Sequence, residues 1–234
     1  MNRIEVKILD GDLNGMPKFL ARLTQRGHEI KSMTDVQKLY DDAMCSGAPS
    51  EYLLSLPHTT IQRMNYITVA ITGLSTKAVS QLRTHAKRLT FVSTSTQYSD
   101  FSGCNDNYVI PAGLSEKDIE LMRKAYKDIQ SVYENLIIAG VDKDKAGYLL
   151  PQGLRKTLII SGSLDDWNYV LRTRLCHRNT EEVQQIAFLI KNEIANVFGE
   201  EYTVNMLPPC VKGKCLEGKF SCGRRYYENK VYSI

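Results

Sequence analysis

Residues 66–98, YITVAITGLSTKAVSQLRTHAKRLTFVSTSTQY, decide the fold class. The first six of them are rich in β-branched side chains and predict a short strand. Ser75 then stands where a helix would begin, and its side chain is a good N-cap for the segment that follows. Residues 90–95 are either another strand or an irregular polar segment. A strand, a helix and a polar segment in succession indicate a mixed α/β protein.

The rest of the chain continues this alternation. Residues 3–9 place Ile4, Val6 and Ile8 on one face, with the period of two that is typical of a strand. Residues 115–140 predict a long helix, because they combine a Ser cap, an acidic first turn, apolar residues three and four apart, and a closing glycine. A further strand is expected at 156–162, and further helices at 18–26, 35–47, 50–56, 75–88, 164–175 and 180–197.

The composition is that of an ordinary globular protein. The chain has 234 residues, 43% of them hydrophobic and 24% charged, which is enough to bury a sizeable core. A net charge of +4 is too small to indicate a nucleic acid partner, and no apolar run approaches the roughly 18 residues that a membrane helix needs.

The same features predict the location and the domain count. The charged N-terminal stretch MNRIEVKILDGD is unlike a signal peptide, so a cytoplasmic protein with six reduced cysteines is expected. No repeat or linker divides the chain. We therefore expect residues 1–234 to form a single domain with a cysteine-bearing tail at 208–234.

Basic side chains surround His85 in the segment RTHAKR at 83–88. Such a cluster either binds a phosphate group through charge-assisted hydrogen bonds or is a solvated basic face. Ser93 and Ser95 lie two residues apart, so on a strand their hydroxyl groups face the same way. They either contact a substrate or belong to an ordinary polar strand.

Two other positions offer anion-binding groups. Arg174 and Arg178 are four residues apart and share one helical face if a helix has begun there; they form either an anion clamp or ion pairs with Glu181 or Glu182. His58 follows a proline, and is either a functional imidazole or a loop histidine bonded to backbone.

The tail segment PPCVKGKCLEGKFSCG contains Cys210, Cys215 and Cys222. Three thiolates bind zinc when a fourth ligand is present, and Cys176 or His177 is a candidate. The gaps between the tail cysteines lack the CxxC spacing of structural zinc sites, so we expect no metal and treat these cysteines as a weak candidate site.

Five segments in order along the chain are similar to those of the flavin-dependent thymidylate synthases, the ThyX family. They are PHTTIQRM, YITVAITGLS, QLRTHAKRLTFVSTSTQY, LIIAGVDKDKAGYLLP and RLCHRNTEEVQ. The resemblance implies an α/β (α+β) ThyX-like fold, with a central mixed sheet flanked by long helices. It also implies a homotetramer that binds FAD and deoxyuridine monophosphate and makes thymidylate with methylenetetrahydrofolate and NADPH as co-substrates.

The resemblance implies roles for particular residues. Ser95 and Arg174 would be catalytic: Ser95 would orient the pyrimidine, and Arg174 would stabilise negative charge that develops on it. The implied cofactor-binding residues are His58, Thr60, His85, Lys87, Arg88 and Ser163. The implied substrate-binding residues are Gln81, Ser93, Gln97, Tyr98 and Arg178.

The chain also departs from the family pattern. The family triplet Arg-His-Arg is Thr84, His85 and Ala86 here if one residue is inserted after it, and Gly147 and Gln97 stand where the family has arginines. Since each charged hydrogen bond contributes roughly 1.5–3 kcal/mol, the loss of several cations would weaken a buried anion site considerably.

These matches and departures leave several functions open. The first is a divergent family member that transfers a one-carbon unit to C5 of a pyrimidine nucleotide. The alternatives on the same fold are a flavin-independent pyrimidine-nucleotide hydroxymethylase and a non-catalytic binding protein. A nucleic-acid module that uses the patch at 83–88 is disfavoured, because the chain shows neither clustered aromatics nor a strong basic excess.

Overall fold

The computed structural model describes residues 3–45, 48–56, 59–211, 213 and 215–223. Within them, four strands form one sheet in the order β1-β2-β4-β3, with every neighbouring pair antiparallel. The α/β fold class is confirmed, but the expectation of a mixed sheet is wrong. The strands are β1 (Glu5–Gly11), β2 (Tyr66–Ser75), β3 (Thr90–Ser93) and β4 (Arg155–Ser163).

The position of β4 between β2 and β3 explains why every neighbouring pair of strands is antiparallel. Both strands run antiparallel to β4, so they are parallel to each other, as expected of strands joined by a helix. They do not pair, however, because β4 lies between them. The sequence between 66 and 98 predicts the strand and the helix that follows it, but contains nothing about the strand that is inserted between β2 and β3.

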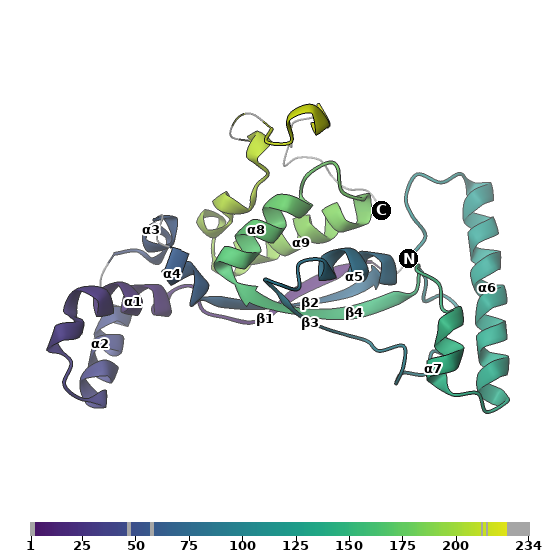
Figure 1. Cartoon of the computed structure of the whole chain (residues 1–234), viewed down its shortest axis with the longest axis horizontal. Helices are drawn as coiled ribbons and strands as arrows, with labels where there is room; N and C mark the ends of the chain where they lie inside the picture. The colour runs from purple at the N-terminus through teal and green to yellow at the C-terminus, as the bar shows by residue number, and fades with distance from the viewer. Residues whose placement is uncertain (1–2, 46–47, 57–58, 212, 214, 224–234) are drawn as a thin grey trace.

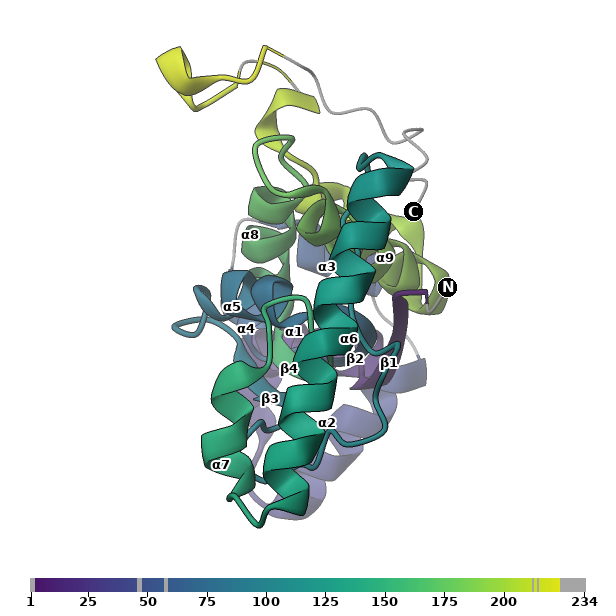
Figure 2. The same ribbon diagram turned by 90° about the vertical axis from the view of Figure 1, so that its right-hand side faces the viewer.

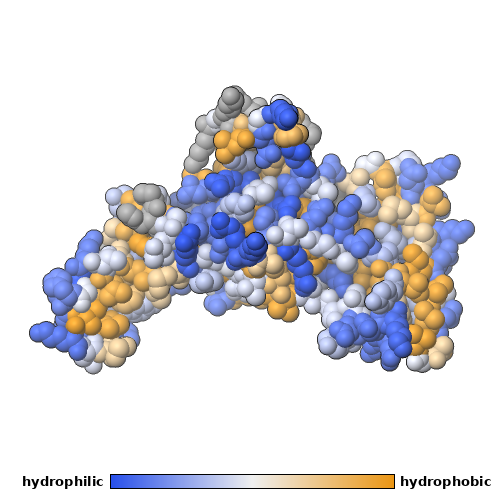
Figure 3. All heavy atoms as spheres, in the orientation of Figure 1, coloured by the Kyte–Doolittle hydropathy of each residue, from blue (hydrophilic) through white to orange (hydrophobic). Residues whose placement is uncertain are grey.

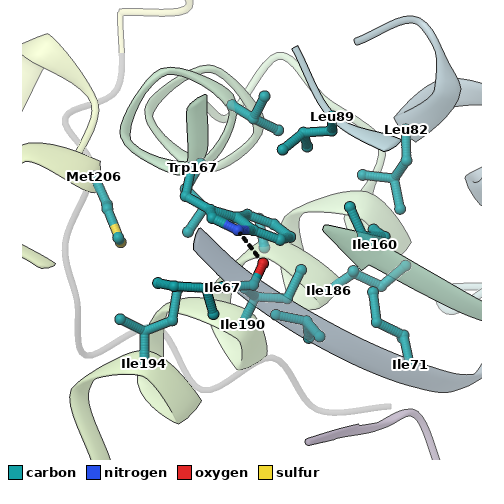
Figure 4. Packing of buried hydrophobic residues seen from close by; sticks show 14 of the residues in the cluster. Ile67, Ile71, Leu82, Leu89, Ile160, Trp167, Ile186, Ile190, Ile194 and Met206 are labelled. Atoms are coloured by element: carbon teal, nitrogen blue, oxygen red, sulfur yellow. Dashed lines mark hydrogen bonds between the residues drawn. The ribbon is translucent and has the colours of Figure 1, made fainter. Parts of the chain in front are cut away.

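One face of the sheet carries the main core. Ile67, Val69 and Ile71 alternate along β2 with more exposed residues and are fully buried. Trp167 lies in the same core and donates its indole N–H to the carbonyl of Ile67, at 3.0 Å (Figure 4). In Figure 1 three helices lie over this face, namely α5 (Thr76–Arg83), α8 (Leu164–Arg174) and α9 (Glu181–Phe198).

Helical segments extend from both ends of the sheet, so that the chain is elongated (Figures 1 and 2). The purple and blue end holds α1 (Gly15–Arg26), α2 (Met33–Cys45), α3 (Ser50–Ser55) and α4 (Thr59–Arg63). The teal end is an arm made of α6 (Glu116–Ile138) and α7 (Lys143–Ala146), which we call the α6–α7 arm.

The α6–α7 arm has a small core of its own. It consists of Phe101, Tyr108, Tyr133, Ala146 and Leu154. Apolar side chains are also visible on the outside of the arm and around α1 and α2 (Figure 3). Long surface helices with exposed apolar residues offer material for contacts with other chains.

Most predicted elements are confirmed, and their ends differ. Ser115 caps α6 and accepts a hydrogen bond from the Asp118 amide, as its sequence predicts. The helix expected at 75–88 ends at Arg83, and turns follow over residues 84–88. Residues 90–93 form a strand, whereas 94 and 95 do not. Among the described residues no helix is both long and apolar enough to cross a membrane.

Candidate functional site

Arg174, at the end of α8, holds three segments together. Its Nε donates to Nε2 of His85 at 2.8 Å, and its Nη1 donates to Oδ1 of Asn179 at 2.8 Å. Its Nη2 donates to the carbonyl of Gln81 at 2.7 Å and to the hydroxyl of Thr84 at 2.6 Å. Four of the five guanidinium N–H groups are therefore used within the chain, and one remains for a ligand. We call this cluster the Arg174 corner.

The imidazole of His85 is neutral in this setting. Burial, with the positive charges of Arg174 and Arg88, lowers the pKa of His85 to about 4. Because Nε2 accepts a hydrogen bond from Arg174, the ring proton lies on Nδ1. His85 thus offers a ligand one N–H donor and no positive charge.

A pocket of about 450 Å³ lies close to this corner. We call it the cofactor pocket, after the cofactor-binding role that the family resemblance implies for Lys87, Arg88 and Ser163, and it is lined by Arg63, Tyr66, Lys87, Arg88, Ser163 and Asp166. The ring of Tyr169 connects it to the corner, since the Arg88 guanidinium lies 4.2 Å above that ring and the His85 ring meets it edge-on at 6.2 Å.

Carboxylates already neutralise part of the charge in the cofactor pocket. Nη1 of Arg88 lies 3.2 Å from Asp166, and Nε of Arg63 lies 3.2 Å from Asp165. Among the described residues no carboxylate lies within ion-pair distance of Lys87. Lys87 is therefore the cation of this pocket that is most available to a phosphate group.

Ser163 shapes the pocket through the start of α8. It forms a capping box with Asp166: the Ser163 side chain accepts from the Asp166 amide at 3.2 Å, and its hydroxyl donates to the Asp166 carboxylate at 2.6 Å. The side chain of Ser163 is buried, and its hydroxyl is already hydrogen-bonded within this cap. Ser163 therefore fixes the position of Asp166 at the start of α8.

The serine segment after β3 lies in a turn. The oxygen of Ser95 accepts from the amides of Gln97 and Tyr98 at 3.1 and 3.3 Å, which leaves its own proton free to donate. Tyr98 is 76% exposed. Ser93 accepts from Arg83 at 2.8 Å.

The other predicted site residues are less closely grouped. The side chain of Gln81 accepts a hydrogen bond from Thr180 at 2.9 Å, at the edge of the Arg174 corner. Arg178 binds the tail instead, donating to Glu217 and to the carbonyl of Phe220. Thr60 is an exposed residue of α4, and His58 lies outside the described residues.

The family model described as "Thymidylate synthase complementing protein" (Thy1) matches residues 16–199. The chain belongs to this family. The predicted resemblance to the ThyX proteins is thereby confirmed.

Named relatives agree with the family assignment. The flavin-dependent thymidylate synthase of Geobacter sulfurreducens is 25% identical over 178 residues, which cover 74% of this chain and 74% of the relative. The enzyme of the same name from Thermococcus onnurineus is 26% identical over 189 residues, covering 75% of this chain and 76% of the relative.

Solved structures share the fold. The Helicobacter pylori ThyX structure with FAD and dUMP superimposes with a TM-score of 0.65 at 15% identity, over 86% of this chain and 99% of that one. The UMP/dUMP methylase PolB from Streptomyces cacaoi, bound with 5-Br dUMP, gives a TM-score of 0.64 at 15% identity, over 89% and 99%.

Sequence reasoning missed several residues that build this candidate site. Asp166 and Tyr169 lie three apart on α8, and the pattern Ser163-x-x-Asp166 is a capping-box signature that identifies the helix start. Asn179 and Thr84 bind Arg174 directly, and Thr84 stands where the family triplet has an arginine.

The cysteines give little support for a metal. Burial raises the pKa of the Cys176 thiol, and nearby Cys222, Cys210 and Cys215 raise it further. The six cysteines are free thiols. In the part of the chain that the structure describes, no three His, Cys, Asp or Glu side chains form a group that could hold a metal ion.

Proposed function

We propose that this protein is a flavin-dependent enzyme that transfers a one-carbon unit from methylenetetrahydrofolate to C5 of a deoxyuridine monophosphate-type nucleotide. The observation that carries the proposal is the cationic cofactor pocket directly beside the Arg174 corner. Membership of the Thy1 family supports it, as do relatives named flavin-dependent thymidylate synthase and a fold neighbour that contains FAD and dUMP.

The cofactor pocket suits the diphosphate of FAD. Its lining includes three cations, Arg63, Lys87 and Arg88, against the single carboxylate of Asp166. Lys87 and Arg88 would hold the phosphate oxygens, and the exposed ring of Tyr66 offers a flat apolar surface. Bound FAD would supply the redox chemistry that delivers a hydride.

The net reaction defines what the chain's own residues must do. C5 of the pyrimidine loses its proton and gains a methyl group, made of the methylene carbon of the folate and a hydride that originates from NADPH. Tetrahydrofolate and NADP⁺ leave as products. The protein must therefore hold the pyrimidine, exclude water and stabilise the negative charge that develops on the ring.

The Arg174 corner and the serine turn can perform these tasks. Arg174 keeps a full positive charge and one unused N–H donor, both fixed in place by its four hydrogen bonds. Ser95 retains a free hydroxyl proton for a carbonyl oxygen of the base. Gln81, Gln97 and Tyr98 would contact the remaining groups of the nucleotide.

The proposal includes assembly into a homotetramer, which the family resemblance implies. Large apolar side chains on and next to the α6–α7 arm support a subunit interface, since Leu121, Val132 and Ile138 of α6 and Tyr148, which follows α7, are all at least half exposed. Light scattering at several protein concentrations tests this. A monomer at every concentration would remove the tetramer from the proposal.

Release of tritium from the C5 position of labelled deoxyuridine monophosphate tests the reaction. With FAD, NADPH and methylenetetrahydrofolate present, the proposal predicts tritium release with thymidylate as the product. A hydroxymethyl product that forms without FAD would identify the flavin-independent hydroxymethylase instead. Binding of FAD and nucleotide with no tritium release would identify a non-catalytic relative.

A further inference from the structure

A second cavity, of about 500 Å³, lies at the ends of β1, β2 and β4, next to residues 94–107 that lead from β3 to α6. We call it the Lys156 cavity. None of its lining residues also lines the cofactor pocket, so the two are separate sites. Its size falls in the range of pockets that enclose small molecules, about 300–1,000 Å³.

The charges that line the Lys156 cavity are unbalanced. Three cations, Arg3, Arg155 and Lys156, face it together with one carboxylate, that of Glu5. Among the described residues no carboxylate lies within ion-pair distance of any of the three cations. The lining therefore carries an excess of two positive charges.

Two of these cations are partly removed from water and incompletely bonded. Lys156 is 6% exposed, and its ammonium donates to the carbonyl of Thr94 at 3.1 Å, which uses one of its three N–H groups. Nη1 of Arg155 donates to the carbonyl of Gly73 at 2.9 Å, but its Nε is buried with no hydrogen-bond partner in the described chain.

Glu182 lies beyond ion-pair distance of Arg155 but favours its positive charge, whereas Lys156 has no such carboxylate among the described residues. A buried charge that is left unpaired is costly, because it is stable only when it is paired and hydrogen-bonded. Burial, and to a lesser degree Arg83, lowers the pKa of Lys156 to about 8. Among the described residues, two contacts partly offset the cost of burying the Lys156 ammonium. They are the Phe101 ring at 4.9 Å and the Thr94 carbonyl at 3.1 Å.

We propose that the Lys156 cavity binds a dianionic small molecule, and that its chemical class is a phosphate monoester. The two charges of the dianion match the excess of two positive charges. The free Nε of Arg155 and the remaining N–H groups of Lys156 supply donors for phosphate oxygens. The hydroxyls of Thr72 and Thr157 and the amide of Asn107 add neutral hydrogen-bonding groups. The volume beyond a bare phosphate leaves room for an organic group.

Titration calorimetry with inorganic phosphate tests the proposal, at constant ionic strength and with chloride as the background anion. We expect wild-type protein to bind phosphate and Lys156→Met to bind it roughly tenfold more weakly, the loss of one charged hydrogen bond. Lys124→Met, an exposed lysine of α6, is the matched control and should bind as the wild type does.

Glu5→Gln provides a second variant that does not depend on removing a buried group. Glu5 is exposed, and its loss removes the only carboxylate of the lining, so phosphate should bind several-fold more tightly. A stabilising role for Lys156 alone would not produce this gain.

Three results would overturn the inference. The first is a wild-type protein that binds no phosphate at millimolar concentrations. The second is phosphate binding that Arg88→Gln abolishes while Lys156→Met and Glu5→Gln leave it unchanged, since the anion would then occupy the cofactor pocket. The third is glutarate binding as tightly as phosphate, which would refute the phosphate class.

Discussion

The cofactor pocket and the Lys156 cavity both gather three cations, but they treat the charge differently. In the cofactor pocket Arg88 and Arg63 pair with Asp166 and Asp165, and the adjacent Arg174 makes four hydrogen bonds. In the Lys156 cavity the side-chain hydrogen bonds that the structure describes for Arg155 and Lys156 go to backbone carbonyls. Arginines that are paired in this way hold neighbouring segments in place, whereas we propose that the unpaired cations of the Lys156 cavity bind an anion.

The largest effect is expected when Arg174 is removed. Arg174→Ala should lower the free energy of unfolding by about 3 kcal/mol, because it leaves the partners of several charged hydrogen bonds unpaired. Nucleotide affinity should fall roughly tenfold or more, because the variant loses the positive charge and the N–H donor that we propose bind the pyrimidine. Urea unfolding and calorimetry with deoxyuridine monophosphate measure the two effects.

Arg172→Ala is the matched control for that variant. Arg172 lies on the same helix but is exposed, and its only described contact is a cation–π approach at 6.0 Å to Tyr169. Its loss should change stability by about 0.5 kcal/mol or less. Equal losses of nucleotide affinity in the two variants would contradict the role given to Arg174.

A smaller effect is expected at His85, whose folded pKa of about 4 lies below the ordinary 6.5. As the pH falls below 6.5, the unfolded chain takes up the proton before the folded one does, so stability declines until the pH reaches about 4. Discounted for solvent screening, the decline is about 1–2 kcal/mol.

The His85→Gln variant isolates this contribution. Glutamine keeps an acceptor for Arg174 and does not titrate, so the difference in unfolding free energy between wild type and variant should change between pH 6.5 and 4. A constant difference over that window would show that His85 is not held neutral in the folded protein.

Asp166→Asn should make the cofactor pocket more like the Lys156 cavity, because Arg88 then loses its paired carboxylate. Loss of the Arg88 ion pair and of the charged cap on α8 should lower stability by about 1 kcal/mol. FAD affinity, measured by ultrafiltration, should rise a few-fold because a competing carboxylate is gone.

Asp165→Asn separates the two effects of Asp166→Asn. Asp165 pairs with Arg63 at 3.2 Å and lies 3.8 Å from Arg88, but it takes no part in the capping box. This variant should gain FAD affinity with little loss of stability. A loss of FAD affinity in both variants would mean that the carboxylates bind the cofactor rather than compete with it.

The smallest effect is expected from chelators. In the described part of the tail the thiols form no group that could hold a metal ion, and burial disfavours the thiolate of Cys176. Protein purified without chelator should contain well under one zinc per chain, and dialysis against a chelator should leave its melting temperature unchanged. Stoichiometric zinc would contradict this prediction.

Local sequence patterns were enough to predict most of the fold. The period-two alternation in β1 and β2 and the cap and spacing of α6 depend on neighbouring residues, so they are visible in the sequence. The place of β4 between β2 and β3 depends on contacts between residues about 70 to 90 apart, which no local pattern records.

The candidate site was predictable in its residue types and less so in its pairings. Arg174, His85, Gln81, Lys87 and Arg88 do gather around the ends of α5 and α8. The sequence does not reveal, however, that Arg174 donates hydrogen bonds to His85 and Thr84. Nor does it reveal the Lys156 cavity, because its lining comes from four separate stretches of chain.

The visible absorption spectrum of the purified protein with added FAD tests the central claim most directly. The account predicts a protein-bound flavin spectrum that shifts again on addition of deoxyuridine monophosphate, with the second shift lost in Arg174→Ala. A spectrum identical to that of free FAD, with the flavin passing through an ultrafiltration membrane, would contradict it.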